Sequence, residues 1–279
     1  MATFYNQATL SYGGNVVNSN VTEAELLSGL ELSKSAVTDS YTAGGSIVYT
    51  VTLSNMGNSA YSNLTLTDNL GAYNIPGGGT AVPLTYVDGS IRYYLNGVLQ
   101  PAPTVSSTGN LEIQGIDLPP SSTATFVYAT VVNEFAPIAE GSSIINTVST
   151  EELTASSTVI VNEAPALTIA KAVCPPIITD NGTVTYTLIV QNLGNSPIVA
   201  TDGVIISDVF NPILSDITVL LNGTALAPGT GYTYDQTTGE FSTTDGTVTV
   251  PAATYTQDPV TGAITTTPGV TILTITGTV

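Results

Sequence analysis

The sequence predicts an all-β protein with two tandem immunoglobulin-like β-sandwich domains and an N-terminal strand extension. Runs of Val, Ile, Thr and Tyr alternate with polar residues, and turn signals such as Asn-Gly separate these runs. One sequence unit also occurs twice. Many short alternating strands with regular turns are typical of β-sandwiches. The chain has one Cys and no Trp, which excludes the Cys–Trp–Cys set of an antibody domain.

The repeated unit predicts that the two domains share one fold. Residues 47–59 match residues 184–196 without a gap, and both segments contain Tyr-Thr followed by Asn-x-Gly-Asn-Ser. The same offset of 137 positions relates Lys34 to Lys171. Within the repeat, alternate residues of the run 47–53 are apolar, which predicts a strand with one buried face.

A second match has an offset of 140 positions and relates Asn6 to Asn146 and Glu23-Ala24 to Glu163-Ala164. This second match defines two segments that we call tails, about 1–29 and about 142–164. The first match defines two segments that we call bodies, 30–141 and 165–279. Within this chain the second body has no tail after it and the first tail has no body before it. We therefore expect three units: a donor-strand extension (1–29), a complete first domain (30–164) and a second domain that lacks its final strands (165–279).

Two turn signals predict individual hairpins. Asn96-Gly97 and Asn222-Gly223 each lie between two apolar runs, and Asn-Gly at this place favours a two-residue hairpin turn. The only helix-like stretch, residues 22–27, is short.

Composition excludes several functional classes. The chain has 3 Lys and Arg against 21 Asp and Glu, a net charge of -18, so it lacks the basic surface that nucleic acids require. It has no His, the commonest general base and metal ligand. No apolar run approaches the length of a membrane span. We expect no enzyme activity on other molecules, no cofactor, no metal, no nucleic-acid partner and no membrane insertion.

Strand alternation places three kinds of polar residue on apolar strand faces. Each body contributes a Lys and an Asp, and each tail contributes an Asn. Burying an unpaired charge costs several kcal/mol, so we expect these groups to meet. They are Lys34 and Asp68 in the first body, Lys171 and Asp208 in the second, and Asn6 and Asn146 in the tails, with Phe4, Ala8 and Leu10 beside Asn6 on the donor strand.

Lys, Asp and Asn in an apolar core can form an isopeptide bond. Burial lowers the pKa of a lysine and raises that of a carboxyl group, so the amine becomes nucleophilic and the acid can polarise the amide carbonyl. The amine then attacks the Asn carboxamide and ammonia leaves. The sequence thus predicts Lys34–Asn146 within one chain, assisted by Asp68. The alternative is a buried Lys–Asp ion pair braced by the Asn amide.

The second copy of these residues predicts a link between chains. Lys171 would bond to Asn6 of another subunit, with Asp208 assisting. This chemistry resembles that of the self-crosslinking domains of Gram-positive pili.

The motifs also resemble a conserved repeat of bacterial surface proteins, a domain of unknown function catalogued as number eleven. The pattern consists of an apolar strand ending in Lys, a Tyr-Thr strand ending in Asn-x-Gly-Asn, a strand with Asp after two apolar residues, and a final Asn-Thr strand. The resemblance covers roughly nine-tenths of the chain and implies an extracellular protein, closest in type to leaderless spore appendages. Its segments are Leu30–Lys34, Gly45–Asn58, Leu64–Leu70 and Ile145–Thr147, then Leu167–Lys171, Gly182–Asn195 and Val204–Phe210.

Together these observations favour a structural subunit of a self-assembling extracellular or spore-surface filament. Residues 2–24 would insert into the second body of the next subunit, so the partners would be copies of the same chain joined head to tail. The alternative is a ligand-binding adhesin or surface-protein fragment, in which each tail folds with the body that follows it and no polymer forms.

Overall fold

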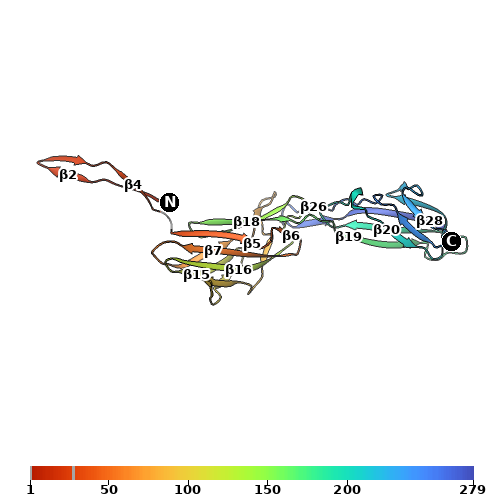
Figure 1. Ribbon diagram of the computed structural model, residues 1–279, viewed down its shortest axis with the longest axis horizontal. Coiled ribbons are helices and arrows are strands. Elements are labelled where there is room, and N and C mark those ends of the chain that lie inside the picture. Colours follow the sequence, from red (N-terminus) through yellow and green to blue (C-terminus); the bar gives the residue numbers. More distant parts are fainter. Residues whose placement is uncertain (1, 27–28) are drawn as a thin grey trace.

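The computed structural model describes residues 2–26 and 29–279 of the chain. Figure 1 shows three parts in a row: a thin N-terminal hairpin, a first β-domain and a second β-domain that ends near the C-terminus. The predicted all-β class is confirmed, because the regular elements of the described residues are strands apart from one 3-10 turn, η1 (Ala200–Asp202). None of the described helical residues forms a segment long and apolar enough to cross a membrane.

Residues 2–26 form a long β-hairpin, which we call the arm. β1 (Ala2–Asn6) pairs with β4 (Thr22–Leu26), and β2 (Thr9–Tyr12) pairs with β3 (Asn15–Asn18), both antiparallel. The helix-like pattern at residues 22–26 is thus a strand, because pairing with β1 outweighs weak local helix propensity. In the described residues these four strands pair only with one another.

The first sheet of the first domain has the order β13-β12-β16-β7-β5, and β11 also pairs with β16. Strand alternation directs one face of β7 into the core, where every second residue from Ile47 to Asn55 is buried. The strands are β5 (Leu30–Ala36), β7 (Ser46–Asn55), β11 (Leu84–Tyr86), β12 (Arg92–Leu95), β13 (Val98–Leu99) and β16 (Ser122–Val132).

The second sheet has the order β14-β15-β8-β17-β18-β6 and closes the sandwich. β17 and β18 form an antiparallel hairpin, and β17 also pairs with β8, so the second tail completes the body that precedes it. The strands are β6 (Ser40–Tyr41), β8 (Tyr61–Asp68), β14 (Thr104–Ser106), β15 (Leu111–Leu118), β17 (Ser143–Ser149) and β18 (Thr154–Val161); β9 (Tyr73–Asn74) and β10 (Thr80–Ala81) form a separate small pair.

The second domain repeats the first sheet and only part of the second. Its larger sheet has the order β19-β20-β28-β22-β23, and its smaller sheet has the order β21-β25-β24. A separate apolar core fills the space between them. The strands are β19 (Leu167–Cys174), β20 (Thr183–Asn192), β21 (Ser207–Val209), β22 (Ser215–Leu221), β23 (Thr224–Ala225), β24 (Tyr232–Tyr234), β25 (Glu240–Thr243), β26 (Thr254–Gln257), β27 (Ile264–Thr267) and β28 (Gly269–Thr278).

The two predicted Asn-Gly hairpins are confirmed. Asn96-Gly97 joins β12 to β13, and Asn222-Gly223 joins β22 to β23. Both residues of each turn have positive φ, which is the conformation that favours Asn-Gly in tight hairpins.

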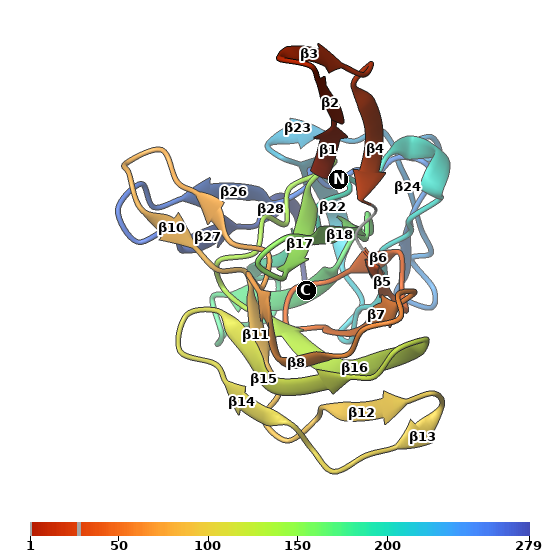
Figure 2. The same ribbon diagram turned by 90° about the vertical axis from the view of Figure 1, so that its left-hand side faces the viewer.

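The β26–β27 hairpin holds the two domains together. Gln257 Nε2 donates to the Tyr73 hydroxyl oxygen (2.7 Å), and the Ile264 N–H donates to the Glu134 carbonyl (2.9 Å). Figure 2 looks along the molecule from the arm and shows β26 and β27 beside β10 of the first domain. The junction within one chain therefore has its own polar contacts in addition to the covalent connection.

Candidate functional site

The first domain contains a buried cluster built from both of its sheets. β5 contributes Lys34, while β8 and β17 of the opposite sheet contribute Asp68 and Asn146. The Lys34 and Asp68 side chains are 0% and 1% exposed, and Asn146 is fully buried. β17 sets the position of the amide. Val148 lies opposite Asp68, and Asn146, two residues before Val148, points to the same face of the strand.

Asp68 is the centre of the cluster. Its Oδ2 pairs with Lys34 Nζ and accepts a hydrogen bond from the Tyr128 hydroxyl. Its Oδ1 accepts from the Leu70 N–H at 2.8 Å. Lys34 Nζ also lies 4.8 Å from the centroid of the Tyr49 ring, a favourable cation–π distance. The carboxylate is therefore held by a cation, a hydroxyl and a backbone donor.

Burial decides the protonation behaviour of the cluster. Desolvation lowers the pKa of Lys34 from 10.5 to about 8, although the Asp68 charge and hydrogen bond oppose the shift. Desolvation, and after it the Asp68 charge, raises the pKa of Tyr128 well above its ordinary value. The lysine is thus easier to deprotonate than in water, while the tyrosine stays a hydrogen-bond donor.

The Asn146 amide is held at one end only. Its Oδ1 accepts from the Gly71 N–H at 3.1 Å. Its Nδ2 is buried and has no hydrogen-bond partner among the described residues, although a buried donor without a partner normally costs about 1–3 kcal/mol. Burial raises the pKa of Tyr49, and the nearby Asn146 amide opposes that rise. The Asn146 amide is thus oriented through its carbonyl oxygen, while its amino group lies near the Tyr49 hydroxyl without a hydrogen bond of standard geometry.

The second domain contains the same ion pair in an open form. Lys171 on β19 pairs with Asp208 on β21, and Lys171 Nζ lies 4.7 Å from the Tyr186 ring centroid. These side chains are 40% and 18% exposed. The prediction that they are buried is therefore wrong for a single chain, because alternation identifies the strand face but not what covers it.

Among the described residues, no counterpart of the β17–β18 hairpin covers this pair. β8 pairs with both β15 and β17, whereas its counterpart β21 pairs only with β25 in the described residues. β18 also covers β5, where Ser157 Oγ accepts from the Ala36 N–H at 2.9 Å. Without such a cover on β19, Leu167 is 40% exposed, while its counterpart Leu30 is 6% exposed.

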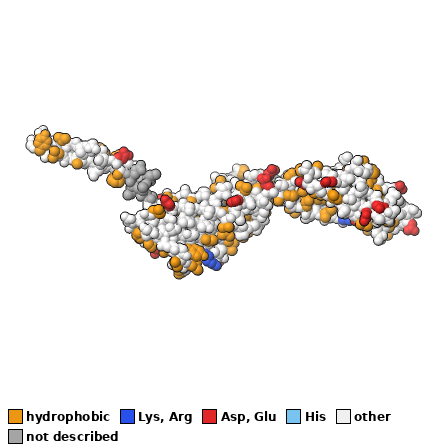
Figure 3. All heavy atoms as spheres, in the orientation of Figure 1, with side chains coloured by type: hydrophobic (Ala, Val, Ile, Leu, Met, Phe, Trp, Pro, Cys, Tyr) orange, Lys and Arg blue, Asp and Glu red, His pale blue; other side chains and the backbone are white. Residues whose placement is uncertain are grey.

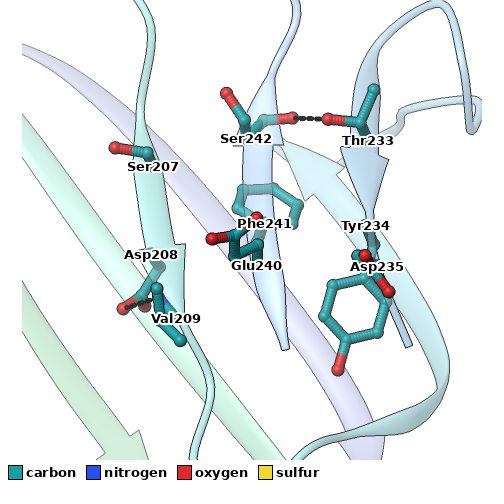
Figure 4. A pocket seen from close by; sticks show the side chains of 9 residues that line it. All are labelled: Ser207, Asp208, Val209, Thr233, Tyr234, Asp235, Glu240, Phe241 and Ser242. Carbon is teal, nitrogen blue, oxygen red and sulfur yellow. Dashed lines mark hydrogen bonds between the residues drawn. The ribbon is translucent and has the colours of Figure 1, made fainter. Parts of the chain in front are cut away.

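An open hollow of about 640 Å³ lies over the smaller sheet of the second domain. Figure 4 shows β21, β25 and β24 side by side, with Asp208 on β21 at one side and Tyr234 on β24 at the other. The Asp208 Oδ1 accepts only from the adjacent Val209 N–H, at 2.9 Å. The described residues contain no group of three or more Asp, Glu or Cys side chains placed to hold a metal ion.

The structure does not bring Asn6 to Lys171 within one chain. Asn6 is exposed on the arm, at the opposite end of the molecule from the second domain (Figure 1). Phe4, Ala8 and Leu10 are exposed as well, and Figure 3 shows hydrophobic side chains gathered towards the far tip of the arm. The arm thus exposes the apolar side chains of Phe4 and Leu10, and among the described residues its strands pair only with one another.

Two tyrosines of the first cluster were missed by sequence reasoning. Tyr49 could have been found, because the repeat places Tyr186 at the same position. Tyr128 could not, because it lies opposite Tyr49 in the sheet and the corresponding residue opposite Tyr186 is Ile275. The second site therefore lacks a hydroxyl donor to its carboxylate at this position.

Searches against known proteins give fold-level similarity only. No protein-family model matches the chain, so its resemblance to the bacterial surface repeat stays a prediction, and no curated protein matches. One similar structure is the C-terminal domain of the AgI/II polypeptide BspA of Streptococcus agalactiae, with 12% identity over 89% of this chain and 91% of that chain and a TM-score of 0.37.

Two further similar structures are pilins. The BcpA(D312A) major pilin subunit of Bacillus cereus has 10% identity over 94% of this chain and 70% of that chain, with a TM-score of 0.38. The RrgB pilus backbone of Streptococcus pneumoniae has 11% identity over 86% and 55%, with a TM-score of 0.36.

Proposed function

We propose that this protein is the structural subunit of an extracellular or spore-surface filament in which the arm of one subunit completes the second domain of the next. The observation that carries this proposal is the contrast between two copies of one ion pair. β17 and β18 cover Lys34 and Asp68, whereas Lys171 and Asp208 are open. The arm is the segment of this chain that matches β17–β18 in sequence, and among the described residues its strands pair only with one another.

The side chains of the arm fit the vacant position. Phe4 corresponds to Ile144 and Ala8 to Val148, both of which point into the first core. Asn6 lies between them, as Asn146 does in β17. The intervening residue Tyr5 corresponds to an exposed position. The arm therefore offers an apolar face interrupted by one amide, which is what the first domain uses.

The backbone of β21 supplies the second attraction. An edge strand with unpaired N–H and C=O groups is a template for another strand, and strand addition supplies main-chain hydrogen bonds together with pockets for alternate side chains. In the first domain the Asn69 N–H donates to the Thr147 carbonyl at 2.9 Å. By the 140-position match, Val209 of one subunit would donate to Gln7 of the next.

The arm must change its own pairing when it inserts. In the free arm Asn6 lies opposite Thr22, whereas Asn146 lies opposite Ser157 in the first domain. The match assigns Ser157 to Val17, not to Thr22. The second strand of the hairpin would therefore slide along the first during assembly, and the first strand alone fixes the register against β21.

This contact makes an open polymer. The arm and the second domain lie at opposite ends of the chain (Figure 1), so the surface that donates differs from the surface that accepts. A heterologous contact of this kind need not close into a ring and produces fibres. Each subunit would be joined to two others, one through its arm and one through its second domain.

Electron microscopy of the purified full-length chain tests this proposal. We expect unbranched filaments from the full chain and separate particles from a variant lacking residues 2–24. A variant with Tyr5→Ala and Asn18→Ala, two exposed residues of the arm, controls for general damage to this segment and should still form filaments. Filaments from the shortened variant, or none from the full chain, would contradict the proposal.

A further inference from the structure

We propose that each joint between subunits becomes covalent, through an amide bond from Lys171 Nζ of one subunit to Cγ of Asn6 of the next, with Asp208 carrying the proton. This inference rests on the proposed function, because only the inserted arm brings Asn6 to the second domain. It goes further in assigning a modification site and a leaving group to the joint. Nothing outside the chain is required as a reactant.

The first domain provides a template for the geometry. There the amine, the carboxylate and the amide come from β5, β8 and β17, and all three are buried. The amide carbonyl is held by the Gly71 N–H at 3.1 Å, while Nδ2 has no partner among the described residues. The electrophile is thus oriented through its carbonyl oxygen.

The second domain already holds two of the three reacting groups. Lys171 and Asp208 are paired, and Lys171 Nζ lies over the Tyr186 ring at 4.7 Å, much as Lys34 lies over Tyr49 at 4.8 Å. It lacks an amide and a cover that excludes water. By the sequence match, the arm supplies both at once, since Asn6 carries the amide and Phe4 and Ala8 carry the apolar face.

The reaction balances without an oxidant, a reductant or water. The proton of the Lys171 ammonium moves to the Asp208 carboxylate, which leaves a neutral amine and a carboxylic acid. The amine attacks Cγ of Asn6, and the acid donates to the amide as the tetrahedral intermediate forms and collapses. The Nζ–Cγ bond forms, the Cγ–Nδ2 bond breaks, and ammonia leaves with the transferred proton as ammonium, restoring the Asp208 carboxylate.

Exposure of the second site controls when the bond forms. In a free subunit the Lys171 side chain is 40% exposed, so water has access to its amino group. Burial by the arm removes that water. The buried ion pair of the first domain shows the effect of removing water from the lysine, because desolvation lowers the pKa of Lys34 to about 8. The joint is therefore locked only after correct insertion.

The same chemistry applies within the first domain, where Lys34 would bond to Asn146 with Asp68 assisting. That bond would form inside one chain and lower its mass by one ammonia, but it would not join subunits. It serves as an internal reference, because a shortened variant without the arm retains this site and loses the other.

The test uses filaments of the full-length chain, boiled in detergent and separated by size, with peptide mass spectrometry of the products. We expect a ladder of covalent multimers and a linked peptide that joins Lys171 to Asn6 and is lighter than its two parts by one ammonia. Asn6→Ala should abolish the ladder, and the matched arm variant Asn18→Ala should retain it.

A second variant separates loss of the bond from loss of the filament. Lys171→Arg keeps a cation beside Asp208, but a guanidinium cannot be deprotonated in a protein and does not attack. We expect filaments of Lys171→Arg that dissolve completely in boiling detergent. Wild-type filaments that also dissolve to single chains would overturn this inference and leave the proposed assembly intact, whereas absence of filaments would overturn both. A ladder that persists in Asn6→Ala would overturn the assignment of the bond.

Discussion

Replacing Phe4 by Ala should weaken each joint between subunits by about 2–3 kcal/mol. Phe4 is 56% exposed in the free arm, and its counterpart Ile144 is 2% exposed in the first domain. Moving about half of a phenylalanine side chain out of water contributes roughly 1 kcal/mol, and the cavity left by truncation adds about as much again or more. A tenfold change in affinity corresponds to about 1.4 kcal/mol, so the critical concentration for assembly should rise roughly 30- to 140-fold.

Tyr5 provides the matched control on the same strand. It corresponds to Ile145, which remains 56% exposed in the completed first domain. Its side chain should therefore stay in water after insertion, and Tyr5→Ala should change the critical concentration by less than about threefold.

The assay is sedimentation of filaments from subunits at a series of concentrations. All variants carry Lys171→Arg, so that assembly stays reversible and the free subunit concentration reports the affinity. Equal losses from Phe4→Ala and Tyr5→Ala would refute the reasoning, because they would show that the arm does not insert with the strand alternation of β17. No loss from Phe4→Ala would refute it as well.

Three further outcomes follow from the charges. In an Asn146→Ala background, which keeps the Lys34 amine free, Asp68→Ala should lower the free energy of unfolding of the first domain by about 3–5 kcal/mol in denaturant titrations, because it leaves Lys34 buried without a partner. Asp208→Ala should cost less than about 1 kcal/mol in unassembled subunits, where the Lys171–Asp208 pair is partly exposed. In the Asn146→Ala variant the free energy of unfolding should rise from about pH 8 towards pH 9 by at most about 1.4 kcal/mol per pH unit, because the folded state has released a proton that the unfolded chain still binds at its ordinary pKa of 10.5. In this range the tyrosines of the unfolded chain still hold their protons, so the raised pKa values of Tyr49 and Tyr128 do not oppose the rise. A fall over this range would contradict the lowered pKa of Lys34. Added salt should lower the critical concentration for assembly, measured by light scattering, because subunits with a net charge of -18 repel one another.

Local sequence signals predicted the strands and turns where short-range geometry decides the structure. The alternation in residues 47–53 places Tyr49 and Val51 in the core, and the Asn-Gly pairs form the expected hairpins. The helix-like stretch at residues 22–26 did not follow its local pattern, because pairing with β1 satisfies its backbone groups. Local propensity is weak and is readily overridden by strand pairing.

The candidate site shows where sequence reasoning stops. Alternation identified the strand faces of Lys34, Asp68 and Asn146 correctly as inward, but it gave the same result for Lys171 and Asp208, which are partly open. The β17–β18 hairpin covers Lys34 and Asp68, whereas no corresponding hairpin of the described residues covers Lys171 and Asp208. Such a cover is a property of tertiary structure, which strand alternation does not report. The Tyr128 hydroxyl that donates to Asp68 has no counterpart in the repeat, so no sequence signal pointed to it.

The most direct test of strand donation is a disulfide placed by the predicted register. Ser149 lies opposite Thr67 in the first domain, so the match places Thr9 of one subunit opposite Ser207 of the next, at a Cα separation suited to a disulfide. In a Cys174→Ser, Lys171→Arg background, the pair Thr9→Cys and Ser207→Cys should oxidise to a ladder of multimers that reductant removes. The shifted pair Ser11→Cys and Ser207→Cys should not. A ladder from the shifted pair alone, or no ladder from either pair in chains that have assembled, would contradict the account.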